Sequence, residues 1–170
     1  GKKPKVLPYR IHDLPDPEKL DNLAQFIARF GYRLRTSGTK TDVSKSINHL
    51  LDDIQGKKEE NLIETVSIRA MQKARYSTHN IGHYGLAFDY YTHFTSPIRR
   101  YPDMMVHRLL ERYLAGGRSV IQKKYEDLCD HCSSMEQVAA NAERASIKYK
   151  QVEFMQDKLG MVFDGVISGV

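Results

Sequence analysis

The stretch from Ser119 to about Lys158 contains neither glycine nor proline, and it constrains the fold more than any other part of the chain. These two residues most often interrupt helices, so their absence over such a length predicts one long helix. Apolar and small residues recur within the stretch at intervals of three or four, which is the spacing of one helical face. They form a stripe that we expect to pack closely against another element: Leu128, Cys132, Met135, Ala139 and Ala142.

Most of the chain before this stretch also shows helical periodicity. Helices are predicted from Asp16-Pro17 to Gly31, from about Asp42 to Gly56, and from the charged residues 57–60 to Met71. Alternating apolar residues predict short strands at residues 7–11 and 86–90, with an irregular break over residues 77–85 between the third helix and the second strand. The predicted fold class is mainly α with a few short β-strands.

Composition excludes some classes of protein. The chain has 170 residues, which is enough for one sizeable core, and a formal net charge of +5, which permits a polyanionic partner without requiring one. Two cysteines are too few for a secreted disulfide scaffold, and no apolar run approaches the length of a membrane span. We therefore expect a cytoplasmic protein that has no membrane partner.

The segment from Tyr91 to Arg108 reads YTHFTSPIRRYPDMMVHR and predicts a ligand site. Ser96 is a preferred residue for the N-cap of a helix, and Pro97 suits the first helical position. Arg99 and Arg100 would then stand in the first turn, where cations oppose the helix dipole unless an anion binds there. The pattern therefore indicates a phosphate site. Because Pro102 would fall inside this helix, a kink or a brief 3₁₀ step is expected near Tyr101.

The same segment resembles the signature of the RNase II/RNase R (RNB) family of processive 3′-to-5′ exoribonucleases, closest to the bacterial RNase R branch. The resemblance includes residues 93–103, His107 and Arg108, and it extends to residues 76–77, 82–87 and 142–144. It covers nearly the whole chain, but only the C-terminal half of the family's catalytic domain. Residues 1–158 would belong to that domain, and residues 159–170 would begin a truncated S1-type OB domain with Met161–Ile167 as its first strand.

The resemblance implies that the longer parent protein hydrolyses single-stranded RNA from its 3′ end and releases nucleoside 5′-monophosphates. In the family, a cluster of aspartates in the first half of the domain binds Mg²⁺. No such cluster is visible here, and the adjacent Asp52 and Asp53 close a predicted helix. We therefore expect no metal ligands in this chain and no activity of the chain alone. The alternative is a non-catalytic helical RNA-binding or scaffold module that retains the signature.

The resemblance also assigns candidate site residues. Arg99 matches an arginine that grips the 3′-terminal phosphates, and Glu143 matches a glutamate near the terminal nucleotide. These two are the catalytic candidates, and the RNA-binding candidates are Ser96, Arg99, Arg100, His93 and Tyr91.

Alternative interpretations of the RNA-binding candidates remain open. His93 and His107 could instead be hydrogen-bonded core histidines. Arg100 could belong, with Arg108 and Arg112, to an ordinary solvated helix face. At most one of four aromatic residues is expected to stack on a base: Tyr90, Tyr91, Phe94 and Tyr101.

Two further spacings suggest metal sites but are better explained otherwise. Cys129 and Cys132 have the Cys-x-x-Cys spacing, but a zinc site needs four ligands and the pair lies in the middle of a predicted helix, so we interpret both as inert thiols. His79 and His83 are four residues apart, but Gly82 argues against one regular helical face.

Finally, an isolated half-domain would expose the apolar stripe, so we expect the isolated chain to self-associate.

Overall fold

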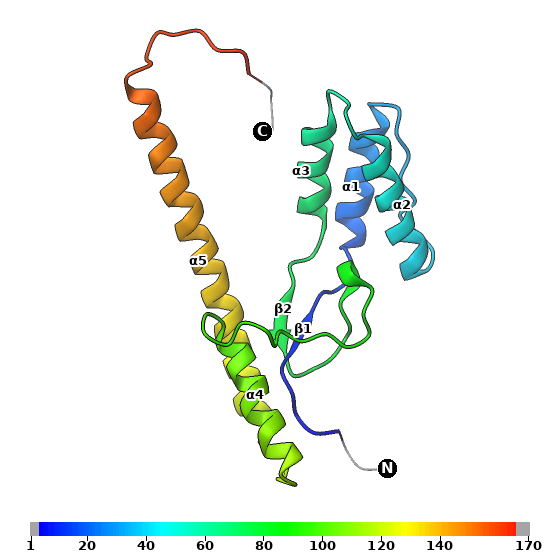
Figure 1. The fold of residues 1–170 in the computed structure, drawn as a ribbon. Helices are drawn as coiled ribbons and strands as arrows, with labels where there is room; N and C mark the ends of the chain where they lie inside the picture. Colours follow the sequence, from blue (N-terminus) through cyan, green and yellow to red (C-terminus); the bar gives the residue numbers. More distant parts are fainter. Residues whose placement is uncertain (1–3, 166–170) are drawn as a thin grey trace. The chain divides into compact units, whose positions relative to one another are not determined.

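The computed structural model describes residues 4–165 (Figure 1). The prediction of a mainly α fold with short strands is confirmed. In chain order the elements are β1 (Tyr9–Ile11), α1 (Pro17–Ala28), α2 (Lys40–Asp53), α3 (Glu60–Ala70), β2 (Arg75–Ser77), the 3₁₀ helix η1 (Tyr84–Leu86), α4 (Tyr101–Leu114) and α5 (Gln122–Gln156). The chain divides into two compact units, one containing α1, α2, α3 and η1, and the other containing both strands, α4 and α5.

Helices α1, α2 and α3 form the first unit, and their ends follow local signals in the sequence. The Asp16 carboxylate accepts a hydrogen bond from the N–H of Glu18 at 3.0 Å, so Asp16 caps α1 as predicted. Thr39 and Asp42 cap α2 reciprocally, which starts that helix two residues before the predicted Asp42. Gly31 has a φ of +87°, a conformation that favours glycine and ends the α1 region.

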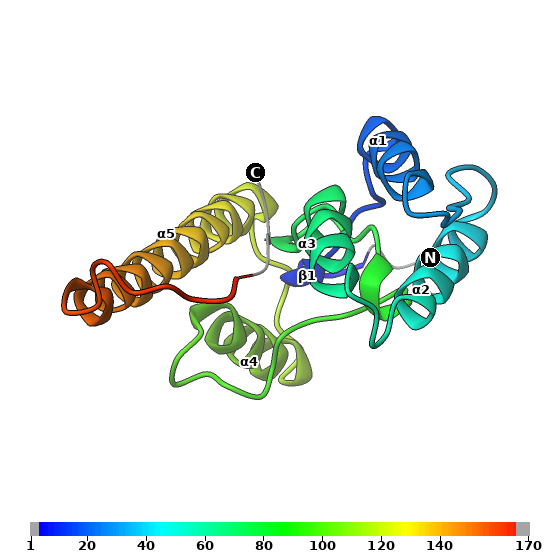
Figure 2. The same ribbon diagram turned by 90° about the horizontal axis from the view of Figure 1, so that it is seen from above.

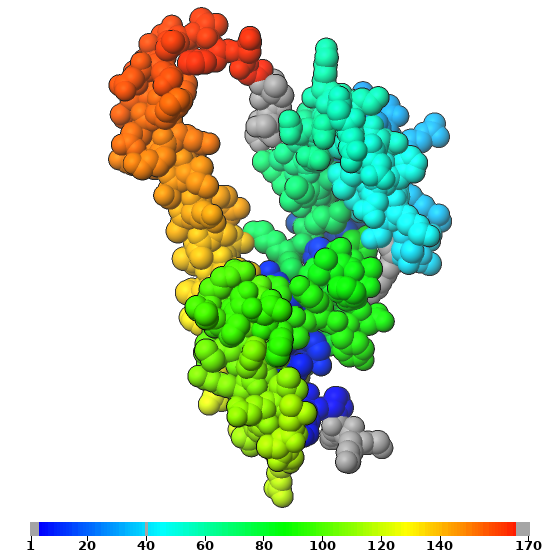
Figure 3. Space-filling view, in the orientation of Figure 1, coloured from blue at the N-terminus to red at the C-terminus, as the bar shows by residue number. Residues whose placement is uncertain are grey.

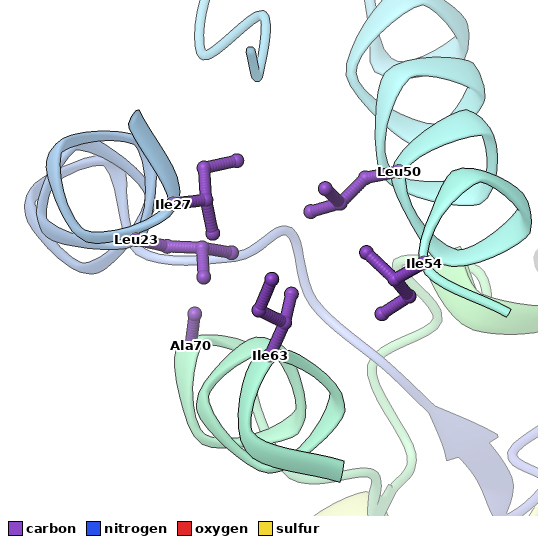
Figure 4. Packing of buried hydrophobic residues seen from close by; sticks show 6 residues of the cluster. All are labelled: Leu23, Ile27, Leu50, Ile54, Ile63 and Ala70. Carbon is purple, nitrogen blue, oxygen red and sulfur yellow. The ribbon is translucent and has the colours of Figure 1, made fainter. Parts of the chain in front are cut away.

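The three helices bury an apolar cluster between them. Figure 4 shows side chains from all three converging, and Figure 2 shows the same helices from above. The cluster consists of Leu23, Ile27, Leu50, Ile54, Ile63 and Ala70. Full burial of one large apolar side chain contributes about 1.5–3 kcal/mol, so this cluster makes a large favourable contribution to the stability of the unit.

The second unit is built on a two-stranded antiparallel sheet and the long helix α5. Strand β1 pairs with β2, with Tyr9 opposite Ser77. The carboxylate of Glu126 in α5 accepts hydrogen bonds at 2.6 Å from the Ser77 hydroxyl and from the Thr78 N–H. The hydroxyl of Ser133, also in α5, accepts the Tyr76 N–H at 2.9 Å. These polar contacts, together with the buried Tyr76, Met105 and Cys129, join β2, α4 and α5.

Helix α5 confirms the predicted long helix, although its apolar stripe is buried only in part. Cys129, which was not assigned to the stripe, is fully buried, whereas Met135 is 45% exposed. All residues from 141 to 157 are exposed. Figure 3 shows one face of this segment, coloured yellow to orange. The stripe is therefore used for packing only in the first half of the helix.

The predicted strand over residues 86–90 is wrong. Tyr84–Leu86 form a 3₁₀ turn instead, and Ala87 has a left-handed backbone with φ of +55°. The N–H of Gly85 donates to Nδ1 of His12 at 3.0 Å, while Nε2 of His12 lies 2.7 Å from the Gln72 carbonyl oxygen. These contacts hold residues 83–88 as a turn on the helical unit, and this tertiary contact overrides the alternating pattern.

The C-terminal segment tests the remaining strand only in part. Residues 161–165 have no regular secondary structure, and the last two residues of the proposed Met161–Ile167 strand lie outside the described residues. That strand, and the domain boundary before it, therefore stay predictions. Within residues 4–165, no helix combines the length and apolar character needed to cross a membrane.

Candidate nucleic-acid interface

The signature segment forms a tight turn before helix α4 begins. The Ser96 carbonyl oxygen accepts hydrogen bonds from the N–H groups of Arg99 at 3.3 Å and Arg100 at 3.0 Å. The helix starts at Tyr101, with Arg100 at the N-cap and Pro102 in the first turn. The predicted start at Ser96 and Pro97 is therefore wrong, and so is the prediction that Pro102 falls inside the helix and distorts it near Tyr101. Pro102 lies where its missing N–H costs nothing, whereas an earlier start would have placed it inside the helix.

Asp103 holds this turn to the helix. Its side chain is fully buried, and Oδ2 accepts hydrogen bonds from the Ser96 N–H and from Nη2 of Arg100, both at 2.8 Å. Burial by itself would raise the pKa of Asp103, but the hydrogen bonds from Ser96 and Arg100, with the Arg100 charge, bring the pKa below its ordinary value. The carboxylate is therefore ionised at neutral pH.

Arg100 is part of the interior of this turn. Its side chain is 21% exposed and forms an ion pair with Asp103. The alternative that placed Arg100 on a solvated face with Arg108 and Arg112 is therefore wrong, because Arg100 precedes the helix and turns inward. Contact between Arg100 and RNA stays a prediction.

Arg99 has a different environment from its neighbour. Its side chain is exposed, and among the described residues the guanidinium forms no hydrogen bond and no ion pair. It lies at a hollow of about 400 Å³ between the turn and α5, lined by Tyr76, Arg99, Arg100, Tyr101, Pro102, Cys132, Met135, Glu136 and Ala139.

The other charges around the hollow cancel in pairs. Arg10 donates two hydrogen bonds to the Glu136 carboxylate, at 2.6 and 3.1 Å, and its guanidinium lies 4.6 Å from the centre of the Tyr76 ring. Arg100 is neutralised by Asp103. Among the residues lining the hollow, Arg99 is therefore the cation without an acidic partner. An uncompensated guanidinium beside a hollow is suited to bind a phosphate.

His93 and Tyr91 precede the turn in the chain. Nδ1 of His93 is 2.8 Å from the Tyr76 hydroxyl, and the Tyr91 ring meets the His93 ring edge-on at 5.8 Å. Burial, followed by the charges of Arg100 and Arg10, lowers the pKa of His93, while burial raises the pKa of Tyr76 to about 12. His93 is thus hydrogen-bonded within the protein, as the core-histidine alternative proposed, and its contact with RNA stays a prediction.

The remaining candidates differ in how much they can offer to a ligand. Both backbone groups of Ser96 are used within the turn, so only its hydroxyl is available. Glu143 is exposed on α5, one helical turn beyond Ala139 of the hollow. Phe94 stacks on His107 with ring centres 4.1 Å apart, whereas Tyr101 lines the hollow and is 49% exposed. Of the four aromatic residues, Tyr101 is the one that lines the hollow, and stacking on a base stays a prediction.

Sequence reasoning missed Asp103, Arg10 and Glu136. Asp103 could have been suspected from its spacing of three residues after Arg100, which is a common ion-pair spacing on helices. Arg10 and Glu136 are 126 residues apart, and no local signal connects them.

Burial is the main cause that raises the pKa of both cysteine thiols, including Cys132, which lines the hollow. Burial raises the pKa of the Cys129 thiol to about 12, so this thiol is protonated and weakly nucleophilic at neutral pH. Across the part of the chain that the structure describes, no group of three or more His, Cys, Asp or Glu side chains could hold a metal ion.

Comparisons with known proteins give consistent results. A family model for the RNB domain matches residues 2–116. Ribonuclease R of Aquifex aeolicus is 41% identical over 165 residues, which cover 95% of this chain and 23% of that protein. The structure of Mycoplasma genitalium RNase R in complex with ribose methylated single-stranded RNA matches with a TM-score of 0.84 and 26% identity, over 98% of this chain and 27% of that one.

A third protein of similar fold is described differently. Yeast Ssd1, a pseudonuclease, matches with a TM-score of 0.63 and 25% identity, over 75% of this chain and 16% of that one. In all three comparisons the chain spans less than a third of the matching protein.

Proposed function

The chain belongs to the RNB domain family, and we propose that the longer protein containing it degrades single-stranded RNA from the 3′ end to nucleoside 5′-monophosphates. The observation that carries this proposal is the environment of Arg99. It is the uncompensated cation at a hollow whose other charges are paired within the protein. The similarity to an RNase R structure that contains single-stranded RNA supports RNA as the ligand.

In the proposed mechanism, Arg99 binds the phosphate at the 3′ end of the RNA. Its planar guanidinium can donate two parallel hydrogen bonds to phosphate oxygens, which both positions the phosphate and neutralises charge that develops during cleavage. Tyr101, which lines the hollow, would stack on the adjacent base, and Glu143 would contact the terminal nucleotide from α5.

Mg²⁺, the cofactor that the family implies, does not fit the residues of this chain that the structure describes. They offer no cluster of carboxylates or other ligands for a metal ion. Its aspartate ligands would therefore have to come from another part of the longer protein, and we propose that the isolated chain has no exoribonuclease activity.

The direct test is to incubate the full-length natural protein and the isolated chain separately with end-labelled single-stranded RNA and Mg²⁺. We expect mononucleotides from the full-length protein and no cleavage by the isolated chain. Metal-dependent release of mononucleotides by the pure isolated chain would contradict the proposal that the metal ligands lie in another part of the longer protein.

A second candidate function is a non-catalytic RNA-binding or scaffold module, and the match to the pseudonuclease Ssd1 favours it. The same assay separates the two functions. A full-length protein that binds the labelled RNA and releases no mononucleotides under any divalent metal would support the module and contradict the nuclease.

A further inference from the structure

Asp103 is the one fully buried acidic side chain in the described part of the chain. Burying an ionised carboxylate is costly unless it is paired and hydrogen-bonded. Here Oδ2 accepts two hydrogen bonds from the signature turn, one from the Ser96 N–H and one from Nη2 of Arg100. An aspartate that served only to start the helix could remain exposed in its first turn, so burial of this one requires a different explanation.

The contacts of Asp103 determine the shape of the turn that carries Arg99. Ser96 is held at its N–H by Asp103 and at its carbonyl by the N–H groups of Arg99 and Arg100. The Arg100 side chain is held by Asp103 as well. Ser96 and Arg100, which flank the Pro97–Arg99 segment, are therefore both anchored to one carboxylate, and that carboxylate belongs to helix α4.

The same carboxylate separates the roles of two adjacent arginines. By neutralising Arg100 it leaves Arg99 as the free cation at the hollow. Without Asp103, either arginine could take the phosphate, and the turn could rearrange between the two.

We infer that Asp103 is a positioning residue for Arg99: it holds the Ser96–Arg100 turn in the one arrangement in which Arg99 faces the hollow and meets the RNA phosphate. This inference rests on the proposed function. Asp103 itself touches neither the ligand nor the reacting atoms, and it acts through the backbone of the turn and through Arg100.

The test is a double-mutant cycle in the full-length natural protein, using Asp103→Asn, Arg99→Ala and the double variant. Single-turnover rates, RNA dissociation constants and thermal midpoints are measured on one oligonucleotide. Asparagine keeps the size of aspartate and can still accept the Ser96 N–H, but it loses the charge that pairs with Arg100. We expect Asp103→Asn to slow cleavage by up to ~10²-fold, the effect of a small misplacement of a catalytic group.

The double variant distinguishes positioning from a general structural role. If Asp103 acts through Arg99, Asp103→Asn should slow cleavage no further once Arg99 is alanine. Multiplicative effects of the two substitutions on the rate would overturn the inference. The matched control is Asp127→Asn, which removes an exposed carboxylate paired with Lys123 on α5 and should leave the rate unchanged.

Two further measurements keep the inference testable in every case. If Asp103→Asn does not fold, Arg100→Gln replaces it, since this variant removes the ion pair and leaves the Ser96 hydrogen bond. If the unmodified full-length protein releases no mononucleotides, the proposed function fails. The inference is then tested by the affinity for short RNA alone. Arg99→Ala should weaken binding in the otherwise unmodified protein but not in the Asp103→Asn variant. Equal weakening in both would refute the positioning role.

Discussion

Replacing Arg99 by alanine in the full-length natural protein tests the candidate site most directly. The structure gives a clear expectation for stability, because the Arg99 side chain is exposed and makes no hydrogen bond or ion pair with the described residues. Surface substitutions of this kind usually change the free energy of unfolding by less than about 0.5 kcal/mol. The variant should therefore fold normally, and any loss of activity can be assigned to the site.

The expected loss of catalysis is much larger than the loss of affinity. A donor that stabilises charge in the transition state typically contributes ~10²–10³ to turnover, which corresponds to about 2.7–4 kcal/mol. A long RNA makes many phosphate contacts, so removal of one should reduce the salt dependence of binding by about one unit and weaken affinity only modestly. Arg99→Lys should restore little activity, because an ammonium group cannot reproduce the bidentate contact.

The assay combines single-turnover cleavage with RNA binding at several salt concentrations. A suitable control is Arg69→Ala, which removes an exposed arginine in the last turn of α3, outside the signature. Arg100→Ala is not a suitable control, since Arg100 forms an ion pair with the buried Asp103. Cleavage by Arg99→Ala at close to the rate of the unmodified protein would refute the phosphate-binding role.

Three other predictions follow from the same structure. Arg100→Ala should destabilise the protein by about 3 kcal/mol, because the Asp103 carboxylate is left buried without its partner, and an unchanged thermal midpoint would contradict this. The pKa of Asp103 is lowered below its ordinary value of 3.8, so its stabilising contribution is complete above about pH 4 and is lost as the pH falls through the folded-state pKa. Acid unfolding curves should accordingly fall more steeply below about pH 4 for the unmodified protein than for Asp103→Asn. The isolated chain should self-associate, because residues 141–157 expose several large apolar side chains, and sedimentation showing only monomer at high concentration would count against it.

Local sequence signals were sufficient for most of the helices. Caps such as Asp16, stops such as Gly31 and the periodic apolar positions act over a few residues, so the sequence by itself determined α1, α2, α3 and α5 to within a few residues. The motif from His93 to Asp103 likewise identified the family, which a match to residues 2–116 then showed.

Tertiary structure decided where the signature helix begins and which of Arg99 and Arg100 has no acidic partner. Sequence reasoning chose Pro97 as the first-turn proline, although the structure shows that Pro102, which satisfies the same local rule, holds that position. The start of the helix depends on the buried Asp103, whose carboxylate binds the turn that precedes the helix. The pairing of Arg10 with Glu136, across 126 residues, also depends on how β1, β2 and α5 pack. Capping and periodicity are encoded in neighbouring residues, whereas the burial and pairing of charges depend on parts of the chain that meet only after folding.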